Sequence, residues 1–163
     1  MADRTVPYGA FNFLVNLNGP SGPETPLGGF SDVSGLGVEL TIAEYRNGND
    51  KENHVTKVAG IHKVADVTLK RGIVNSKDLW DWIKEAQTKG PSAKRSVVIT
   101  LLDEAGTQVE SWKLLNVLPM KYTGPTLAAK GGGDVAMEEL VLSVEKIDLE
   151  VACEIPARQA LHP

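Results

Sequence analysis

Histidine and cysteine are the side chains of this chain best suited to metal binding or nucleophilic chemistry. They are His54, His62, His162 and Cys153. No two histidines have the spacing that places two ligands on adjacent turns of a helix. A single cysteine can complete neither an intrachain disulfide nor a cysteine-based zinc site. We therefore expect no metal or cofactor, and we interpret His62 as an ordinary strand residue and Cys153 as a small apolar side chain.

The serine, glycine and carboxylate motifs give no catalytic constellation either. The segment Asp32-Val33-Ser34-Gly35 lacks the G-x-S-x-G pattern and is typical of a turn. The glycines at 131–133 precede Asp134, which would repel phosphate, instead of Lys and Ser or Thr. The adjacent pairs Asp103-Glu104 and Glu138-Glu139 predict solvent-exposed carboxylates, and on a strand two neighbours point to opposite faces. The sequence does not support an enzyme.

Length and charge favour one acidic, globular domain. The chain has 163 residues, 42% of them apolar and 23% charged, with a formal net charge of −4. That charge, without a cluster of Lys and Arg, disfavours binding to nucleic-acid phosphates. The N-terminal MADRTVPYGAF lacks a secretory apolar core, and no apolar run approaches the roughly 20 residues of a membrane span. We expect a protein that is made and soluble in the cytoplasm.

The first part of the chain alternates apolar and polar residues, as strands do. Residues 11–18 predict a half-buried strand, residues 19–29 a Gly- and Pro-rich loop, and residues 30–33 a short strand that ends at a Ser34-Gly35 turn. Val38, Leu40 and Ile42 then form one apolar face, but after Ile42 the apolar positions shift to Ala43 and Tyr45. A one-residue slip of this kind predicts a β-bulge, or a strand that leaves the core for a second environment.

A polar segment follows, and then the chain returns to a strand. Residues 46–60 predict a flexible loop in which Asn47-Gly48 is a strong tight-turn signal. Residues 63–71 predict one strand, with Ala65, Val67 and Leu69 on its apolar face.

One helix is expected over about residues 76–89. Asn75 or Ser76 can cap it, and Gly90-Pro91 ends it. Trp80 and Trp82 cannot both point into one narrow core face, so one of them should lie at its boundary.

The second half predicts strands again. We expect them at residues 95–102, 108–118 and 135–149, with a turn at 103–106, an irregular connection marked by Pro119, Pro125 and residues 131–134, and a C-terminal arm at 150–163. The fold class expected is mainly β: an antiparallel β-barrel or sandwich-like subunit with one flanking helix. We expect one domain over residues 1–149, followed by the arm.

Several segments in order resemble the inner-tube (tail tube) proteins of contractile phage tails and phage-tail-like contractile injection systems. The segments are FNFLV at 11–15, FSDVSGL at 30–36, IAEYRNG at 42–48, VTLKRG at 67–72, LWDWI at 79–83, ITLLDEAG at 99–106, Trp112, NVLP at 116–119 and EELVL at 138–142. The resemblance covers roughly residues 8–149.

The resemblance implies a hexameric ring with a continuous β-barrel around a lumen. Such rings stack into a rigid tube inside a sheath, assembled in the bacterial cytoplasm and then part of a phage tail or an injection particle. The implied partners are other copies of the chain, the sheath protein, the baseplate and spike, tube-terminating proteins, and effector protein or DNA as cargo. No membrane segment and no catalytic residue are implied.

The segment around the polar loop is then the candidate contact between subunits or rings, and the slip at Ile42 to Ala43 lets the two ends of its strand face different neighbours. The candidate contact residues are Glu44, Tyr45, Arg46, Asn47, Gly48, Asn49, Asp50, Lys51, Glu52, Asn53 and His54. Without the resemblance, a solvated hairpin tip is the simpler interpretation. The alternatives are a hexameric tube protein of the type VI secretion kind, and a monomeric β-barrel that binds a small ligand in an apolar cavity.

Overall fold

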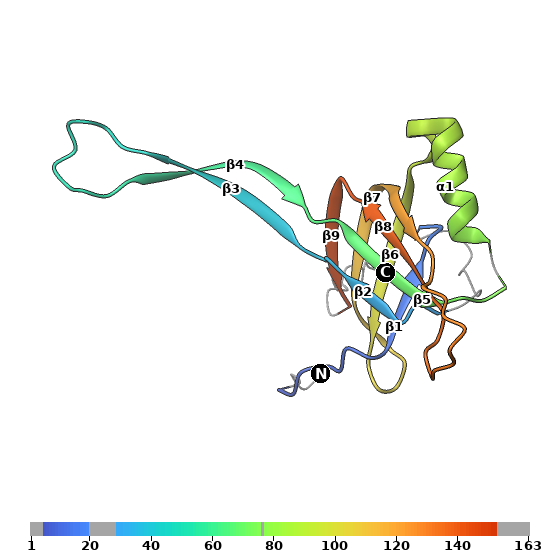
Figure 1. The fold of residues 1–163 in the computed structure, drawn as a ribbon. Coiled ribbons are helices and arrows are strands. Elements are labelled where there is room, and N and C mark those ends of the chain that lie inside the picture. Colours follow the sequence, from blue (N-terminus) through green and yellow to red (C-terminus); the bar gives the residue numbers. More distant parts are fainter. Residues whose placement is uncertain (1–4, 20–28, 76, 153–163) are drawn as a thin grey trace, which may run out of the picture.

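A computed structural model describes residues 5–19, 29–75 and 77–152 of the chain (Figure 1). These residues form nine strands, one α-helix and a short 3-10 turn. In chain order the elements are β1 (Phe13–Asn16), β2 (Asp32–Ser34), β3 (Val38–Tyr45), β4 (Thr56–Val64), β5 (Val67–Gly72), α1 (Asp78–Lys89), a 3-10 turn (Gly90–Ala93), β6 (Arg95–Leu102), β7 (Gln108–Thr123), β8 (Met137–Ser143) and β9 (Lys146–Val151).

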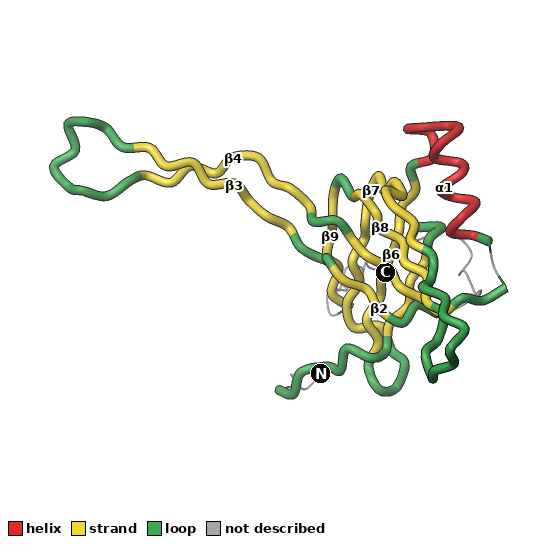
Figure 2. The backbone as a smooth tube through the Cα atoms, viewed as in Figure 1, coloured by secondary structure: helices red, strands yellow, loops and turns green. Residues whose placement is uncertain are grey.

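Strand β7 joins two antiparallel sheets, which together make the body of the subunit (Figure 2). Its first half pairs with β6 on one side and β9 on the other, and β1 extends that sheet beyond β6. Its second half pairs with β8, which is followed by β5 and β2. Asn116 lies between the two halves with a left-handed φ of 53°. A residue of this kind bends a strand, so β7 can serve both sheets. The expected mainly β, antiparallel fold with one helix is confirmed.

Two predicted strand boundaries in the second half were wrong. Strand β7 does not stop at residue 118 but continues through Pro119 to Thr123. Proline is tolerated because the pairing with β6 ends at Val117 and the register with β8 shifts between Pro119 and Lys121. The predicted strand 135–149 is split into β8 and β9. Because β9 runs to Val151, the first residues of the expected arm 150–163 are strand, and residues 153–163 lie outside the described part.

The predicted turns at both ends of the sheets are present. Gly35 follows β2 with φ +86°, and the Gly37 N–H donates to the Gly35 carbonyl at 2.8 Å. In the 103–106 turn, the Asp103 carboxylate accepts hydrogen bonds from the backbone N–H groups of Ala105 and Thr107 at 2.9 and 2.8 Å.

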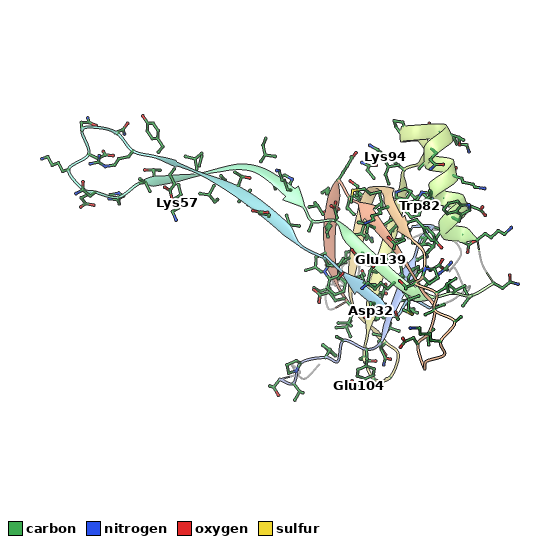
Figure 3. All side chains as sticks on the ribbon, viewed as in Figure 1. Asp32, Lys57, Trp82, Lys94, Glu104 and Glu139 are labelled. Carbon is green, nitrogen blue, oxygen red and sulfur yellow. The ribbon has the colours of Figure 1, made fainter. Side chains whose placement is uncertain are left out.

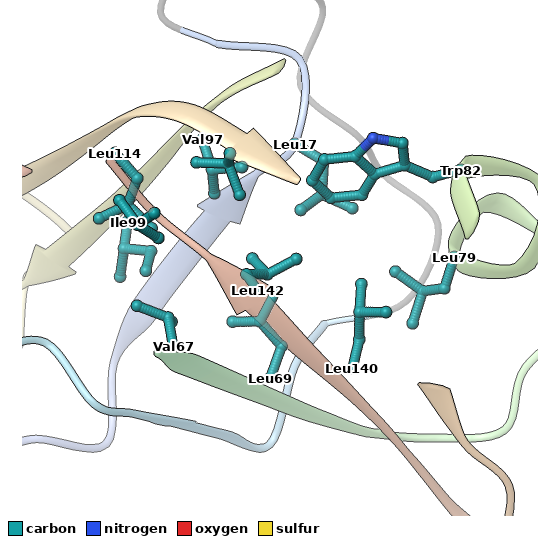
Figure 4. Close-up of a cluster of buried hydrophobic side chains, with 12 residues drawn as sticks. Leu17, Val67, Leu69, Leu79, Trp82, Val97, Ile99, Leu114, Leu140 and Leu142 are labelled. Carbon is teal, nitrogen blue, oxygen red and sulfur yellow. The ribbon is translucent and has the colours of Figure 1, made fainter. Parts of the chain in front are cut away.

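A cluster of apolar side chains between the two sheets and the helix forms the core (Figure 4). Its buried members are Leu17, Val67, Leu69, Leu79, Trp82, Val97, Ile99, Leu114, Val117, Leu140, Leu142 and Val144. Most of them follow the predicted period of two along their strands, because every second side chain of a strand points to the same face. This burial is the main source of the free energy that holds the sheets together.

The helix buries Leu79 and Trp82 in the core but begins later than expected. Its N-cap is Lys77, without a side-chain hydrogen bond, so Asn75 is not the cap, and Ser76 lies outside the described residues. Gly90 ends the helix as predicted, with φ 57°. Trp82 is buried while Trp80 is 45% exposed, so one tryptophan lies at the boundary as expected.

The pair Glu138-Glu139 departs from the prediction of solvent exposure. The two side chains point to opposite faces of β8, as expected, but Glu138 is buried at 6% exposure. It forms an ion pair with Arg71, whereas Glu139 lies 3.8 Å from the Lys70 ammonium at the surface. Sequence alone did not indicate that a buried arginine would face Glu138.

Candidate assembly interface

Strands β3 and β4 pair only with each other and form a long hairpin that projects from the body, which we call the arm hairpin, residues 38–64 (Figure 1). Every residue of β3 and all of β4 except Val64 are exposed (Figure 3). The prediction of one strand over residues 63–71 was wrong. Strand β4 already begins at Thr56, and a break at residues 65–66 separates it from β5. The expected loop 46–60 is shorter, because 56–60 are strand. A two-stranded hairpin alone is marginally stable in water, so an exposed one of this length requires explanation.

The half of the arm hairpin near the body is apolar on one face. Residues paired directly across two strands share a face, and Val38 pairs with Val64 and Ile42 with Ala59. Leu40 shares this face, because it lies two residues from each of its β3 neighbours, and its direct partner on the same face is the polar residue His62. We call these five apolar residues the base patch. The opposite face of the same half carries Glu39 paired with Lys63, which is a charged pair.

The half near the tip has the reverse arrangement. Ala43 pairs with Val58 on the face opposite to the base patch, and Tyr45 lies on that face as well. We call these three residues the tip patch. On the base-patch face the tip half instead carries Glu44 opposite Lys57. The arm hairpin thus presents two apolar patches that face in opposite directions.

A β-bulge lies where one patch gives way to the other. The register shifts between Leu40 and Ile42, so that Thr41 alone faces Gly60 and Ile61. A bulge was predicted from the slip in β3, but the extra residue is on β4. Glycine fits there because a Cβ at position 60 would lie only 3.1 Å from the Thr41 carbonyl oxygen. The β3 side chains still alternate strictly between the two faces of the hairpin. The apolar residues change face because they occupy even positions up to Ile42 and odd positions from Ala43 onward.

The loop at the tip, residues 46–55, is held by hydrogen bonds and does not form the tight two-residue turn that Asn47-Gly48 predicted. The Arg46 guanidinium donates to the Asp50 carbonyl and the Asn53 side chain, both at 3.2 Å, and reaches the Glu52 carbonyl at 3.5 Å. The Asp50 N–H donates to the Asn47 carbonyl at 3.2 Å. One guanidinium therefore spans the loop from its first residue to its far side.

The structure brings most of the predicted contact residues together at this tip. Besides the Arg46 contacts, the Tyr45 hydroxyl donates to Asn47 Oδ1 at 2.8 Å, and His54 Nδ1 lies 3.2 Å from the Glu52 carboxylate. The remaining predicted residues line the same exposed strand end and loop: Glu44, Gly48, Asn49 and Lys51. No side-chain partner is described for these four.

The contact residues predicted from the sequence omit the most apolar part of the arm hairpin. Val38, Leu40 and Ile42 were predicted only to form one apolar face, and Val58 lies in the segment predicted as a polar loop. They are 58%, 49%, 47% and 51% exposed. The change of apolar face at Ile42 and Ala43 was the available signal, because a strand with only one buried face has no use for apolar residues on both.

Other features of the described residues give no competing site. No group of three or more His, Cys, Asp or Glu is placed to hold a metal in residues 5–152 with their gaps. No described helix is long and apolar enough to span a membrane. An open hollow of about 470 Å³ has charged walls that include Asp32, Lys70 and Glu139. It differs from the apolar cavity that a small-ligand barrel would need.

Fold and site together define a β-rich subunit with a protruding hairpin whose apolar patches are exposed, which is typical of a structural protein that assembles. The sequence model of the T4-like virus tail tube protein gp19 matches residues 9–148. The chain belongs to this tail tube family and is a structural protein of an inner tube.

Solved structures agree with this assignment. The chain is similar to a protein in the extended sheath–tube complex of the extracellular contractile injection system PVC, with 26% identity over 90% of this chain and 93% of that one, and a TM-score of 0.76. It is equally similar to a protein in the anti-feeding prophage (AFP) tube terminating cap, with 26% identity over 91% and 94%, and a TM-score of 0.77. Hcp1 from Flavobacterium johnsoniae shares the fold, with 11% identity over 85% and 94%, and a TM-score of 0.50. No curated protein matches the chain.

Proposed function

We propose that the chain forms hexameric rings that stack into a rigid tube around a continuous β-barrel lumen. The tube would serve as a passive conduit for effector protein or DNA, driven forward by a contracting sheath, and would carry out no catalytic step. Its partners would be the sheath, the baseplate and spike, and a tube terminator. Solved relatives that occur in a sheath–tube complex and in a sheath/tube terminator support the sheath and the terminator as partners. Synthesis and assembly would take place in the bacterial cytoplasm.

The arm hairpin is the observation that carries this proposal. Large apolar side chains are exposed along its whole length: Val38, Leu40, Ile42, Tyr45, Val55, Val58 and Ile61. Exposed apolar surface of this extent marks an interaction site, and burial against other copies would stabilise both the hairpin and the assembly. Contacts that cover the hairpin would also pair or shield its strand edges, which otherwise invite aggregation.

The two patches would contact two different copies. A single flat partner can cover only one face of a two-stranded ribbon, whereas the base patch and the tip patch face opposite ways. We place the base patch against one neighbouring subunit, and the tip patch with the predicted contact residues 44–54 against another copy in the same or the next ring. The charged pair Glu39–Lys63, on the face opposite to the base patch, would remain beside the second contact.

Point variants in the arm hairpin test the proposal. Leu40→Glu and Val58→Glu should each abolish rings or tubes, because a carboxylate would be buried in an apolar contact. Glu39→Gln, in the charged pair on the face opposite to Leu40, serves as the control for the base half, as Lys57→Gln does for the tip half. Mass in solution and negative-stain electron microscopy would be measured for wild type and variants. Assembly that survives both glutamate substitutions would contradict the proposal.

A further inference from the structure

At the tip of the arm hairpin, the dipeptide Asn47-Gly48 has a sequence and a geometry that favour a covalent reaction of its own. Asn47 is followed by Gly48 in an exposed turn, and Asn is among the chemically labile residues of proteins. From this arrangement we infer that Asn47 is a site of spontaneous deamidation in the unassembled subunit, and that the Tyr45 hydroxyl promotes the reaction.

The reaction needs only the chain and water. The backbone nitrogen of Gly48 attacks Cγ of Asn47, its proton is lost, and the side-chain amide leaves as ammonia, so that a five-membered succinimide forms. Water then opens this ring at either carbonyl, giving aspartate or isoaspartate at position 47. The net change is the replacement of an amide NH2 by OH, with no oxidation or reduction.

Gly48 removes the usual steric obstacle to the attack. It has no side chain, and a Cβ built there would meet no atom within 4 Å. The attacking nitrogen and Cγ are close in the chain, which favours ring closure by proximity.

Tyr45 is placed where it stabilises the developing charge. Attack on Cγ turns the Asn47 side-chain carbonyl into an oxyanion, and the Tyr45 hydroxyl already donates to this oxygen, Oδ1, at 2.8 Å. A donor aimed at the oxygen that gains negative charge lowers the barrier to addition.

A second Asn-Gly pair in the chain provides an internal control. Asn18 precedes Gly19, which is buried and held at φ +79° with the Ser96 Cβ 3.4 Å from its own Cβ position. This constrained backbone should resist closure of the ring. The structure therefore predicts a difference in rate between two identical dipeptides.

The product would alter the tip. A carboxylate at position 47 would lie beside Asp50, whose carboxylate accepts the Asn47 backbone N–H at 3.2 Å, and like charges at this range repel. Isoaspartate also lengthens the backbone within the loop that Arg46 spans. Deamidated subunits should therefore assemble poorly, and this consequence rests on the function proposed above.

Peptide mapping by mass spectrometry of the full-length, unassembled protein, incubated at mildly alkaline pH, tests the inference. We expect the Asn47 peptide to gain about one dalton several-fold faster than the Asn18 peptide. Gly48→Ala should slow the gain several-fold without unfolding, since the site has room for a methyl group. Tyr45→Phe should slow it as well. Equal rates at Asn47 and Asn18, or no effect of Gly48→Ala, would overturn the site, and an unchanged rate in Tyr45→Phe would overturn the role of Tyr45.

The consequence for assembly is tested separately with Asn47→Asp and Asn47→Ser. Loss of tubes in Asn47→Asp but not in Asn47→Ser supports it, and normal tubes in Asn47→Asp overturn it. If wild type also forms no rings or tubes, the function proposed above fails, whereas the mass measurement on the free subunit still decides the deamidation site.

Discussion

Arg71 on β5 and Glu138 on β8 occupy directly opposed positions in the sheet and form an ion pair whose side chains are 2% and 8% exposed. The pair has further support. The Tyr122 hydroxyl donates to Glu138 Oε2 at 2.8 Å, and the Phe30 ring lies 5.7 Å from the Arg71 guanidinium. A buried charge is tolerated only with such partners, because each ion loses its hydration on folding. The pair therefore joins β5 and β8 beneath the surface of the sheet.

Removing one partner of this pair should destabilise the subunit strongly. Arg71→Ala or Glu138→Ala leaves one buried charge unpaired, and we expect each to lower the free energy of unfolding by about 3–5 kcal/mol. Replacing both by apolar residues, Arg71→Met with Glu138→Leu, should recover much of that loss. Urea unfolding of the three variants measures this, and a double variant as unstable as the sum of the single ones would contradict it.

Much of the body could be predicted from alternation alone. Val97 and Ile99 are buried while the alternating residues Ser96, Val98 and Thr100 are only half-buried, because one face of their sheet meets the core. The Arg71–Glu138 pair could not be predicted in this way. Charged residues on a strand normally predict side chains exposed to solvent. Only the register between β5 and β8 shows that Arg71 and Glu138 lie opposite each other.

Gly35 should not tolerate a side chain, whereas Gly37 should. At Gly35 the backbone is left-handed, and a Cβ would lie 2.1 Å from the Asp66 carbonyl oxygen. At Gly37 the nearest atom to a Cβ is the Ala65 Cβ, at 3.9 Å, which is ordinary contact. Gly35→Ala should therefore lower the free energy of unfolding by at least about 2 kcal/mol, and Gly37→Ala should change it by less than about 1 kcal/mol. Similar midpoints for the two variants in thermal unfolding would argue against this turn geometry.

The two helix tryptophans should differ in their contribution to stability. Trp82 is buried, donates its indole N–H to the Ala93 carbonyl at 3.1 Å and has the Arg95 guanidinium 5.1 Å from its ring. Trp82→Ala should cost about 3–5 kcal/mol. Trp80 is half-exposed and meets Tyr122 edge-on at 5.4 Å, so Trp80→Ala should cost about 1 kcal/mol. Chemical unfolding with a common probe would reveal the order, and a reversed order would exclude the described helix orientation.

Acid should weaken the contact between α1 and β6. The hydrogen bond from Arg95, at 2.6 Å, followed by that from Lys89, holds the pKa of Glu85 below its usual value of 4.5. A carboxylate with a lowered pKa in the folded state adds stability above its unfolded pKa, and this stability is lost as pH falls through the folded value. Glu85→Gln should therefore lose less stability on acidification than wild type does. Glu44→Gln, on the exposed arm hairpin, is the control, and identical pH profiles for wild type and Glu85→Gln would refute the prediction.

The arm hairpin shows where sequence patterns fail for an assembling protein. Leu40 and Ile42 alternate as core residues do, but the body of the same chain does not cover them, and they are 49% and 47% exposed. The polar loop directed the predicted contact to the tip, while Val38, Leu40 and Ile42 were predicted only as one apolar face whose environment stayed open. An apolar period of two indicates that other residues cover one face of the strand. It does not indicate whether those residues belong to the same copy of the chain or to another.

Cryo-electron microscopy of the assembled tube tests the central claim most directly. The account predicts stacked six-fold rings in which the base patch and the tip patch of each arm hairpin are buried against two different copies of the chain. A tube in which the hairpin from Val38 to Val64 projects into solvent, or an assembly without rings, would contradict it.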